Sequence, residues 1–140
     1  AYIHVKKALE INPTDDDYYF TLYFMNEEEG LQDEALKNIS SAIQLNNDQP
    51  EYYFFRGDLF MKKKYWKEAI ADYNRFINSD RQIPSQVFFK RAVAKFYMKD
   101  LTACDDLSTA YSMAEDDEEK KAIASWLNEL CKKNKNKRNL

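Results

Sequence analysis

The residues of this chain repeat every 34 positions, and this period constrains the fold more than any other feature. Within each copy the repeating positions lie 0, 1, 4, 7 and 8 residues from an alanine, the spacing of one stripe along an α-helix. The five series are Ala1, Ala35, Ala69 and Ala103; Tyr2, Leu36, Ile70 and Cys104; Val5, Ile39, Tyr73 and Leu107; Ala8, Ala42, Phe76 and Ala110; and Leu9, Ile43, Ile77 and Tyr111. One such helix cannot bury its apolar stripe alone, so we expect an all-α chain of stacked helical units.

The composition agrees with a single helical domain. Two glycines and three prolines among 140 residues leave few turns for a sheet of short strands. The net charge of −3 gives no bulk attraction to nucleic acid or to an anionic membrane, and no run of 18 apolar residues predicts a membrane span. We expect neither nucleic acid nor membrane as a partner. Because the chain begins without Met or a leader, we also expect it to belong to a longer protein, whose compartment stays open with the cytoplasm favoured.

Prolines, Gly30 and polar clusters divide the repeat into helices. We expect helices over 1–11, 16–28, 32–45, 51–62, 66–78, 86–98, 101–113 and 117–133. The units they form are a truncated unit at 1–13, full units at 14–47, 48–81 and 82–113, and a capping helix at 114–133. The last helix has one apolar stripe, formed by Ile123, Trp126, Leu127 and Leu130, which suits the end of an open stack. Residues 134–140 should form a disordered basic tail.

The middle of the chain has the fullest form of the repeat. It reads Tyr53-x-x-Arg56-Gly57-x-x-Phe60 and then Tyr65-x-x-x-Ala69-x-x-x-Tyr73-x-x-Phe76, and it resembles the tetratricopeptide repeat (TPR). The resemblance covers about 1–113 and implies a right-handed α-α superhelix, a solenoid of antiparallel helix pairs. The end of the chain, Ala103-Cys104-Asp105-Asp106-Leu107 with Cys131 closing the last helix, is similar to the ending of some bacterial TPR proteins.

Three features depart from that pattern. Tyr23 stands where the family has glycine or alanine, so its ring should push the helices apart or tilt outward. Phe76 replaces a small residue at another tight crossing. The helix at 86–98 matches the one at 51–62 at a step of 35, whereas the alanines keep a step of 34. We infer one residue gained before that helix and one lost in the turn after it.

The two cysteines, Cys104 and Cys131, are too few for a disulfide framework. Because Cys104 occupies a stripe position, we expect it to be a small buried hydrophobic residue, with a bridge to Cys131 as the alternative. Together with the single His4, the two cysteines cannot supply the four ligands of a zinc site. We expect no metal and no cofactor.

The resemblance implies a concave face lined by the first helix of each unit, where the family holds a peptide or a partner helix. The residues it places there are Phe20, Phe24, Phe54, Asp58, Phe89, Val93 and Phe96. A ladder of rings on a surface indicates an interaction site. The alternative is that these rings pack between helices.

The charges near this face suggest the chemistry of the partner. Asp58, Glu27 and Glu51 flank the rings, so we expect an apolar segment bearing Lys or Arg. Some family members hold a carboxylate-ended chaperone tail with Lys and Asn. Here those places hold Phe20, Phe24, Phe55 and Gln86, and only Lys90 is basic where the clamp needs it, which disfavours that mechanism.

No motif predicts catalysis or a small-molecule substrate. His4 has no nucleophile or carboxylate at a meaningful spacing, and the acidic runs lack the pattern of a calcium loop. We therefore expect a non-catalytic protein-interaction scaffold. The alternatives are a structural spacer that self-associates through an N-terminal edge of Ile3, Leu9 and Ile11, or a regulatory module of a larger protein.

Overall fold

The computed structural model describes residues 2–132, with the side chains of α1 described only in part, and every regular element in that range is a helix. The eight α-helices are α1 (Tyr2–Ile11), α2 (Asp16–Glu28), α3 (Gln32–Leu45), α4 (Pro50–Lys62), α5 (Trp66–Ile77), α6 (Ser85–Tyr97), α7 (Ala103–Met113) and α8 (Asp117–Trp126). A π-helical segment, Leu127–Lys132, follows α8. The helix bounds expected from the sequence are thus confirmed to within about two residues up to α7. The expected tail at 134–140 lies outside the described residues.

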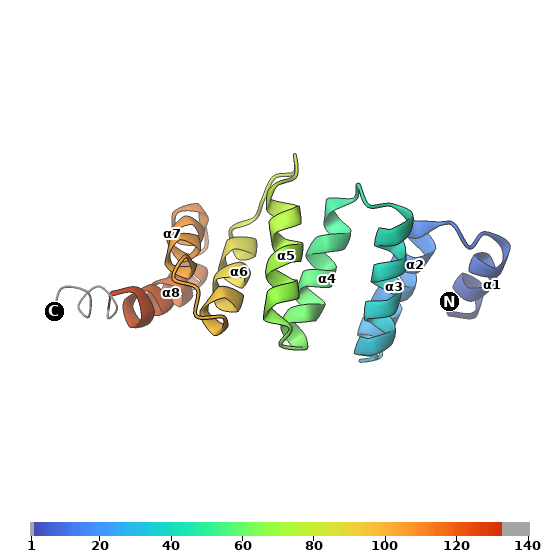
Figure 1. Ribbon diagram of the computed structural model, residues 1–140, viewed down its shortest axis with the longest axis horizontal. Helices are drawn as coiled ribbons and strands as arrows, with labels where there is room; N and C mark the ends of the chain where they lie inside the picture. Colours follow the sequence, from blue (N-terminus) through green and yellow to red (C-terminus); the bar gives the residue numbers. More distant parts are fainter. Residues whose placement is uncertain (1, 133–140) are drawn as a thin grey trace.

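The helices stand side by side in one row that runs from α1 to α8 (Figure 1). The closest packing joins α2 to α3, α4 to α5, and α6 to α7, and each pair then packs on the next. The turns within the pairs lie along the lower edge in Figure 1, and the longer loops between pairs lie along the upper edge. The chain is therefore an all-α solenoid, as the repeat predicts.

The turn within each helix pair has the same backbone device. One residue of each turn adopts a positive φ: Gly30 at 73°, Lys64 at 60° and Lys99 at 58°. Gly30 and Lys64 lie two residues before the next helix begins, and Lys99 lies four before it. In each turn the following N–H group donates to a carbonyl five residues back, as from Tyr65 to Phe60. These bonds satisfy carbonyls that the helix end leaves free. The step from Lys64 to Lys99 is 35 whereas Ala69 to Ala103 is 34, which confirms the residue lost in the third turn.

The alanine stripe lies in the core. Ala35 and Ala69 are fully buried, and Ala103 is 6% exposed. Gly57 lets α4 approach α5, because a Cβ there would lie 2.9 Å from the buried ring of Tyr73. Small residues at these crossings therefore set how closely each pair packs.

The structure accommodates both bulky departures inside the core. Tyr23 does not tilt outward: its ring is 3% exposed, and its hydroxyl donates to the carbonyl oxygen of Phe55 on the next helix pair. The Phe76 ring is also buried and lies 5.4 Å from that of Phe54, between centroids. Tyr23 thus reaches the next helix pair, whereas Phe76 packs against α4 of its own pair, in a core cluster that also contains Val87 of α6.

The end of the chain differs from the sequence expectation in two ways. Cys104 is half-buried and forms a disulfide with Cys131, so it is not simply a buried hydrophobic residue. The last helix leaves α geometry after Trp126 and continues as the π-helical segment that contains Cys131. A π turn shifts the residues after it around the helix axis, so the apolar stripe read from α periodicity does not continue unchanged through this segment.

Candidate partner-binding face

The seven residues proposed from the sequence lie on the first helix of each pair: Phe20 and Phe24 on α2, Phe54 and Asp58 on α4, and Phe89, Val93 and Phe96 on α6. We call this set the aromatic face. Its two end rings are exposed, Phe24 by 42% and Phe96 by 39%. The three equivalent rings, Phe20, Phe54 and Phe89, are half-buried and pack on the core. These three therefore serve helix packing as well as facing outward.

The rings from α2 and α4 form a continuous chain. The centroid of Phe24 lies 4.8 Å from that of Phe20 and 5.1 Å from that of Phe55, and Phe55 lies 5.3 Å from Phe54. Most of these pairs meet edge to face, the arrangement that aromatic quadrupoles favour. Phe55, which is not among the seven proposed residues, thus links the two helices.

The rings at the C-terminal end meet the capping helix. Trp126 of α8 lies 6.0 Å from Phe89 and 5.6 Å from Phe96, both edge to face. Ser85 at the start of α6 also donates to Glu119 of α8 at 2.6 Å. The capping helix therefore covers part of the aromatic face over α6, and Phe96 keeps its exposed edge.

Asp58 is already engaged within the chain. Its carboxylate accepts hydrogen bonds from the Lys90 ammonium at 2.8 Å and from the Tyr73 hydroxyl at 2.6 Å. Lys90 Nζ also lies 4.9 Å from the centroid of Phe54, a cation–π contact. Burial, reinforced by the negative charge of Asp58, raises the pKa of Tyr73 well above its usual 10.0. The phenol therefore stays a donor to Asp58 at neutral pH.

The other two acids flanking this face are paired as well. Glu27 on α2 forms an ion pair with Lys62 on α4, and Glu51 pairs with Arg81 at 2.8 Å. The first of these ion pairs joins successive helix pairs, and the second joins α4 to the loop between α5 and α6. The three carboxylates that the sequence assigned to a basic partner thus each have a cation of this chain beside them.

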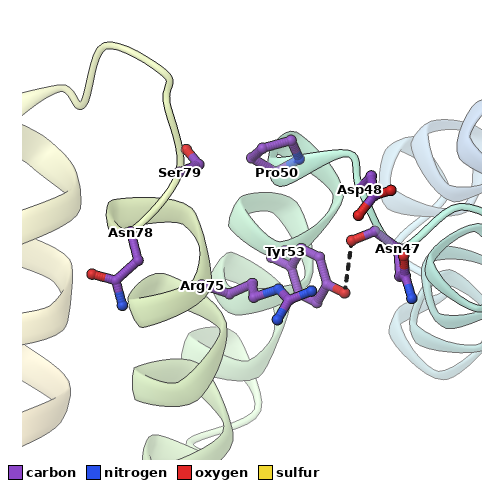
Figure 2. Close-up of a pocket in the computed structure, with 7 residues that line it drawn as sticks. All are labelled: Asn47, Asp48, Pro50, Tyr53, Arg75, Asn78 and Ser79. Carbon is purple, nitrogen blue, oxygen red and sulfur yellow. Dashed lines mark hydrogen bonds between the residues drawn. The ribbon is translucent and has the colours of Figure 1, made fainter.

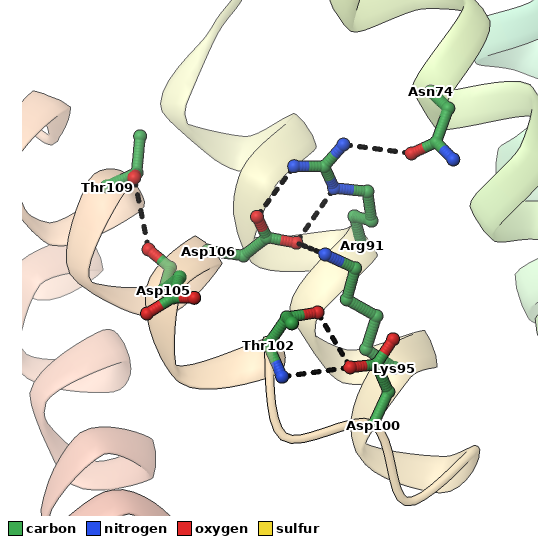
Figure 3. Close-up of polar contacts among 8 residues, drawn as sticks. All are labelled: Asn74, Arg91, Lys95, Asp100, Thr102, Asp105, Asp106 and Thr109. Atoms are coloured by element: carbon green, nitrogen blue, oxygen red, sulfur yellow. Dashed lines mark hydrogen bonds and ion pairs between the residues drawn. The ribbon is translucent and has the colours of Figure 1, made fainter.

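A row of buried polar contacts was missed by the sequence reasoning. Asp72 accepts two hydrogen bonds from Arg56, at 2.7 and 2.9 Å, and Asn26 accepts one from Asn38 at 2.7 Å. In the last pair Asp106 binds both Arg91 and Lys95 (Figure 3). The sequence contained a signal of these contacts, because the polar residues Asn38, Asp72 and Asp106 recur every 34 positions among the apolar residues of the stripe.

The upper edge of the solenoid contains a pocket of about 300 Å³ between the α3–α4 loop and the end of α5 (Figure 2). Tyr53 forms its floor and donates to the carbonyl oxygen of Asn47 at 3.2 Å. Arg75 lies over the same ring, 5.2 Å from its centroid. The pocket is lined by residues of the α3–α4 loop, α4 and the end of α5, and none of them belongs to the aromatic face.

Sites of other kinds find no support in the described part of the chain. Within residues 2–132, no three His, Cys, Asp or Glu side chains are grouped so that they could hold a metal ion. His4 is exposed on α1, as a surface histidine would be. None of the helices in this range has the length and apolar character to cross a bilayer.

No protein-family model matches the chain, and no curated protein sequence matches it. Several solved structures are similar to it. YrrB, a TPR protein with an unusual peptide-binding site, superposes with a TM-score of 0.72 at 19% identity over 85% of this chain. The chain spans 61% of YrrB and 54% of a similar MamA chain, less than two thirds of either.

Two further likenesses are to proteins solved with bound segments. PcrH, in complex with the chaperone binding region of PopD, has a TM-score of 0.72 at 15% identity over 84% of this chain and 92% of PcrH. The Yersinia enterocolitica type III secretion chaperone SycD, with a peptide of the translocator YopD, has 0.68 at 17% identity over 87% and 93%. Together with the row of paired helices, these likenesses show that this chain has the tetratricopeptide-repeat fold.

Proposed function

We propose that this chain is a non-catalytic scaffold that binds a peptide or a helix of a partner protein on its aromatic face. The observation that carries this proposal is the series of rings on three successive first helices, open to solvent at Phe24 and Phe96. Exposed apolar area of this kind on a folded protein usually marks a contact site. Large aromatic side chains also contribute most strongly to binding when a partner covers them.

The similar structures support this role without defining the partner. PcrH and SycD were each solved with a segment of another protein bound, and YrrB is described as having a peptide-binding site. At identities below 20%, only the architecture is shared, so the bound segments of those proteins do not identify the ligand of this one.

The partner we propose is an apolar segment, with basic residues as a secondary feature. A Lys or Arg of the partner at Asp58 would have to displace Lys90, and one at Glu27 or Glu51 would have to displace Lys62 or Arg81. Replacing one cation by another gains little free energy. Burial of the exposed ring surface at the two ends should therefore contribute most of the affinity.

Affinity purification from native extract can test the aromatic face with a matched control. Phe24→Ala and Phe96→Ala remove exposed rings of this face, and Tyr111→Ala removes an equally exposed ring of α7, which is 43% accessible against 42% for Phe24. We expect the first two to weaken capture of a specific partner about tenfold and the third to leave it unchanged. Equal loss in all three, with unchanged circular dichroism, would contradict the proposal.

Self-association of a structural spacer is the second candidate, because α1 has exposed apolar residues. Ile3 is 68% exposed and Ile11 is 86% exposed. If this edge mediates self-association, light scattering should show a mass that rises with concentration, and Ile3→Ser with Ile11→Ser should abolish the rise. A constant monomer mass would remove this candidate. A regulatory role within a larger multidomain protein is compatible with either outcome and is tested by the same partner capture on the full gene product.

A further inference from the structure

The lower edge of the solenoid has a second surface, which meets the aromatic face at Phe96. It is formed by two neighbouring segments, the turn before α5 with the first two residues of α5 (64–67) and the last residue of α6 with the turn after it (97–101), and we call it the basic turn edge. Its apolar residues are unusually open: Tyr65 is 48% exposed, Tyr97 53%, Met98 47% and Leu101 60%. Four large apolar side chains at this exposure on two adjacent turns form a patch rather than scattered single residues.

A ring stack joins the two turns into one surface. The rings of Trp66 and Tyr97 are parallel within 9° and their centroids lie 4.4 Å apart. Lys64 and Lys99 are the positive-φ residues of the two turns, so each turn presents a lysine at its tip. The two tips lie next to each other along the lower edge in Figure 1.

An apolar pocket opens at one end of this surface. Its volume is about 200 Å³, and its walls include Phe96, Leu101, Leu107 and Leu130 beside the Cys104–Cys131 disulfide. Lys99 and Asp100 stand at its rim. A pocket of this size and lining fits one bulky apolar side chain, and the disulfide holds two of its walls together.

Three lysines of this edge form no ion pair within the described part of the chain. In residues 2–132, Lys62 and Lys63 pair with Glu27 and Asp33, whereas Lys64, Lys67 and Lys99 have no carboxylate within ion-pair distance. Asp100 is the acid beside Lys99, and its carboxylate accepts hydrogen bonds from the backbone N–H and hydroxyl of Thr102. Three lysines around exposed rings therefore complement an acidic segment better than a basic one.

We propose that the basic turn edge binds a short acidic segment of a partner protein, whose bulky apolar side chain enters the pocket beside the disulfide. A flat anionic membrane fits less well, because it would meet the whole lower edge, including exposed Glu28 and Glu29 in the turn between α2 and α3. A nucleic acid strand would meet the same carboxylates. A peptide can bind locally and avoid them.

Fluorescence anisotropy with synthetic peptides tests this proposal. Three labelled peptides share a central Leu-Trp pair, flanked by glutamates, by serines or by lysines. We expect the glutamate peptide to bind most tightly, with affinity that falls as salt rises. Lys64→Glu and Lys99→Glu should each weaken it about fivefold, and Leu101→Ser about tenfold, because the first two reverse an attraction and the third opens the apolar pocket.

Matched variants elsewhere serve as controls. Lys37→Glu changes an exposed lysine of α3, and Leu45→Ser changes a leucine 42% exposed at the end of the same helix. Both should leave glutamate-peptide binding unchanged, as should Phe24→Ala, which separates this surface from the aromatic face. The proposal would be overturned if the three peptides bound equally or if Leu101→Ser left binding of the glutamate peptide unchanged. It would also be overturned if the chain preferred phosphatidylserine vesicles or oligothymidine to the glutamate peptide.

Discussion

In each of the three helix pairs, one polar side chain of the second helix is placed among the apolar residues of its stripe and meets a partner from the first helix. Asn38 does so in the first pair, Asp72 in the second and Asp106 in the third. Burying a polar group costs free energy unless it forms hydrogen bonds, so each of these contacts favours the correct alignment of its two helices. The contact in the first pair is incomplete, because the buried Nδ2 of Asn26 has no partner among the described residues. For Asp72, burial raises the pKa of the carboxyl although Arg56 opposes this effect.

Replacing Asp106 should be costly, because its carboxylate faces two cations. The side chains of Arg91 and Lys95 are 16% and 13% exposed, so Asp106→Asn would leave buried charge without its counter-ion. We expect a loss of about 3 kcal/mol in the free energy of unfolding, measured with urea. The neighbouring Asp105 is exposed (Figure 3), and Asp105→Asn should change it by less than about 1 kcal/mol. Similar losses for the two variants would refute this account of the cluster.

The π-helical segment after α8 is held in place by a covalent bond as well as by packing. The disulfide ties the π-helical segment to the first turn of α7 across 27 residues, and Trp126 and Ile123 pack beneath it. Such a link reduces the number of conformations open to the unfolded chain. The bond should therefore stabilise the last helix pair together with its cap.

Removing the disulfide should lower stability by a measurable amount. For a separation of 27 residues, loop-closure entropy gives about 3.5 kcal/mol. We expect Cys104→Ser with Cys131→Ser to lower the thermal midpoint, and a dithiol reductant to lower the midpoint of the parent chain by a similar amount. The reductant should have no effect on the double variant. Equal midpoints for oxidised and reduced parent chains would contradict the prediction.

The elements also show which parts of this structure could be predicted from its sequence. The helices could be predicted, because Ala35, Ala69 and Ala103 recur at a fixed spacing and Pro13, Pro50 and Pro84 mark helix boundaries. The disulfide could not be, since pairing depends on how the last helix turns after Trp126, and a change to π geometry leaves no signal in apolar periodicity. The burial of Tyr23 in the core could not be predicted either, because the next helix pair contributes the space for its ring.

The candidate site was predictable at the level of helix faces and less so at the level of contacts. The step of 34 to 35 places Phe20, Phe54 and Phe89 at equivalent positions, and the structure locates all three on first helices. The pairing of Asp58 with Lys90 was not foreseen, because it joins two helix pairs and depends on their relative position. A repeat pattern describes one unit at a time, so it does not predict the side-chain contacts between units.

At the scale of the whole molecule, three buried tyrosines couple stability to alkaline pH. Burial raises the pKa values of Tyr23, Tyr52 and Tyr73 above the usual 10.0, and nearby carboxylates reinforce the effect. The folded chain therefore keeps three protons that the unfolded chain releases above pH 10.0. Stability from these groups is complete below that pH and falls as pH rises through the range above it.

We expect the free energy of unfolding to fall with a slope that steepens through pH 10 and approaches about 4 kcal/mol per pH unit at about pH 11, since each of the three groups then contributes about 1.4 kcal/mol per unit. Urea midpoints measured from about pH 9 to about pH 11 would show this slope. Tyr73→Phe should reduce it by about a third, although it also leaves Asp58 with one donor fewer. An unchanged slope in that variant would show that Tyr73 ionises equally in both states.

The ion pairs that cross from one helix pair to the next make the order of the units specific. Lys62, the last residue of α4, and Lys63, which follows it, meet Glu27 and Asp33 of the preceding pair. If segment 48–81 followed a second copy of itself, the residues 34 positions on would take those places, and Lys62 would face Met61 while Lys63 would face Lys67. One attraction would be lost and the other would become a repulsion, so the junction in such a tandem duplication should be less stable than the native one, although its helices could still stack.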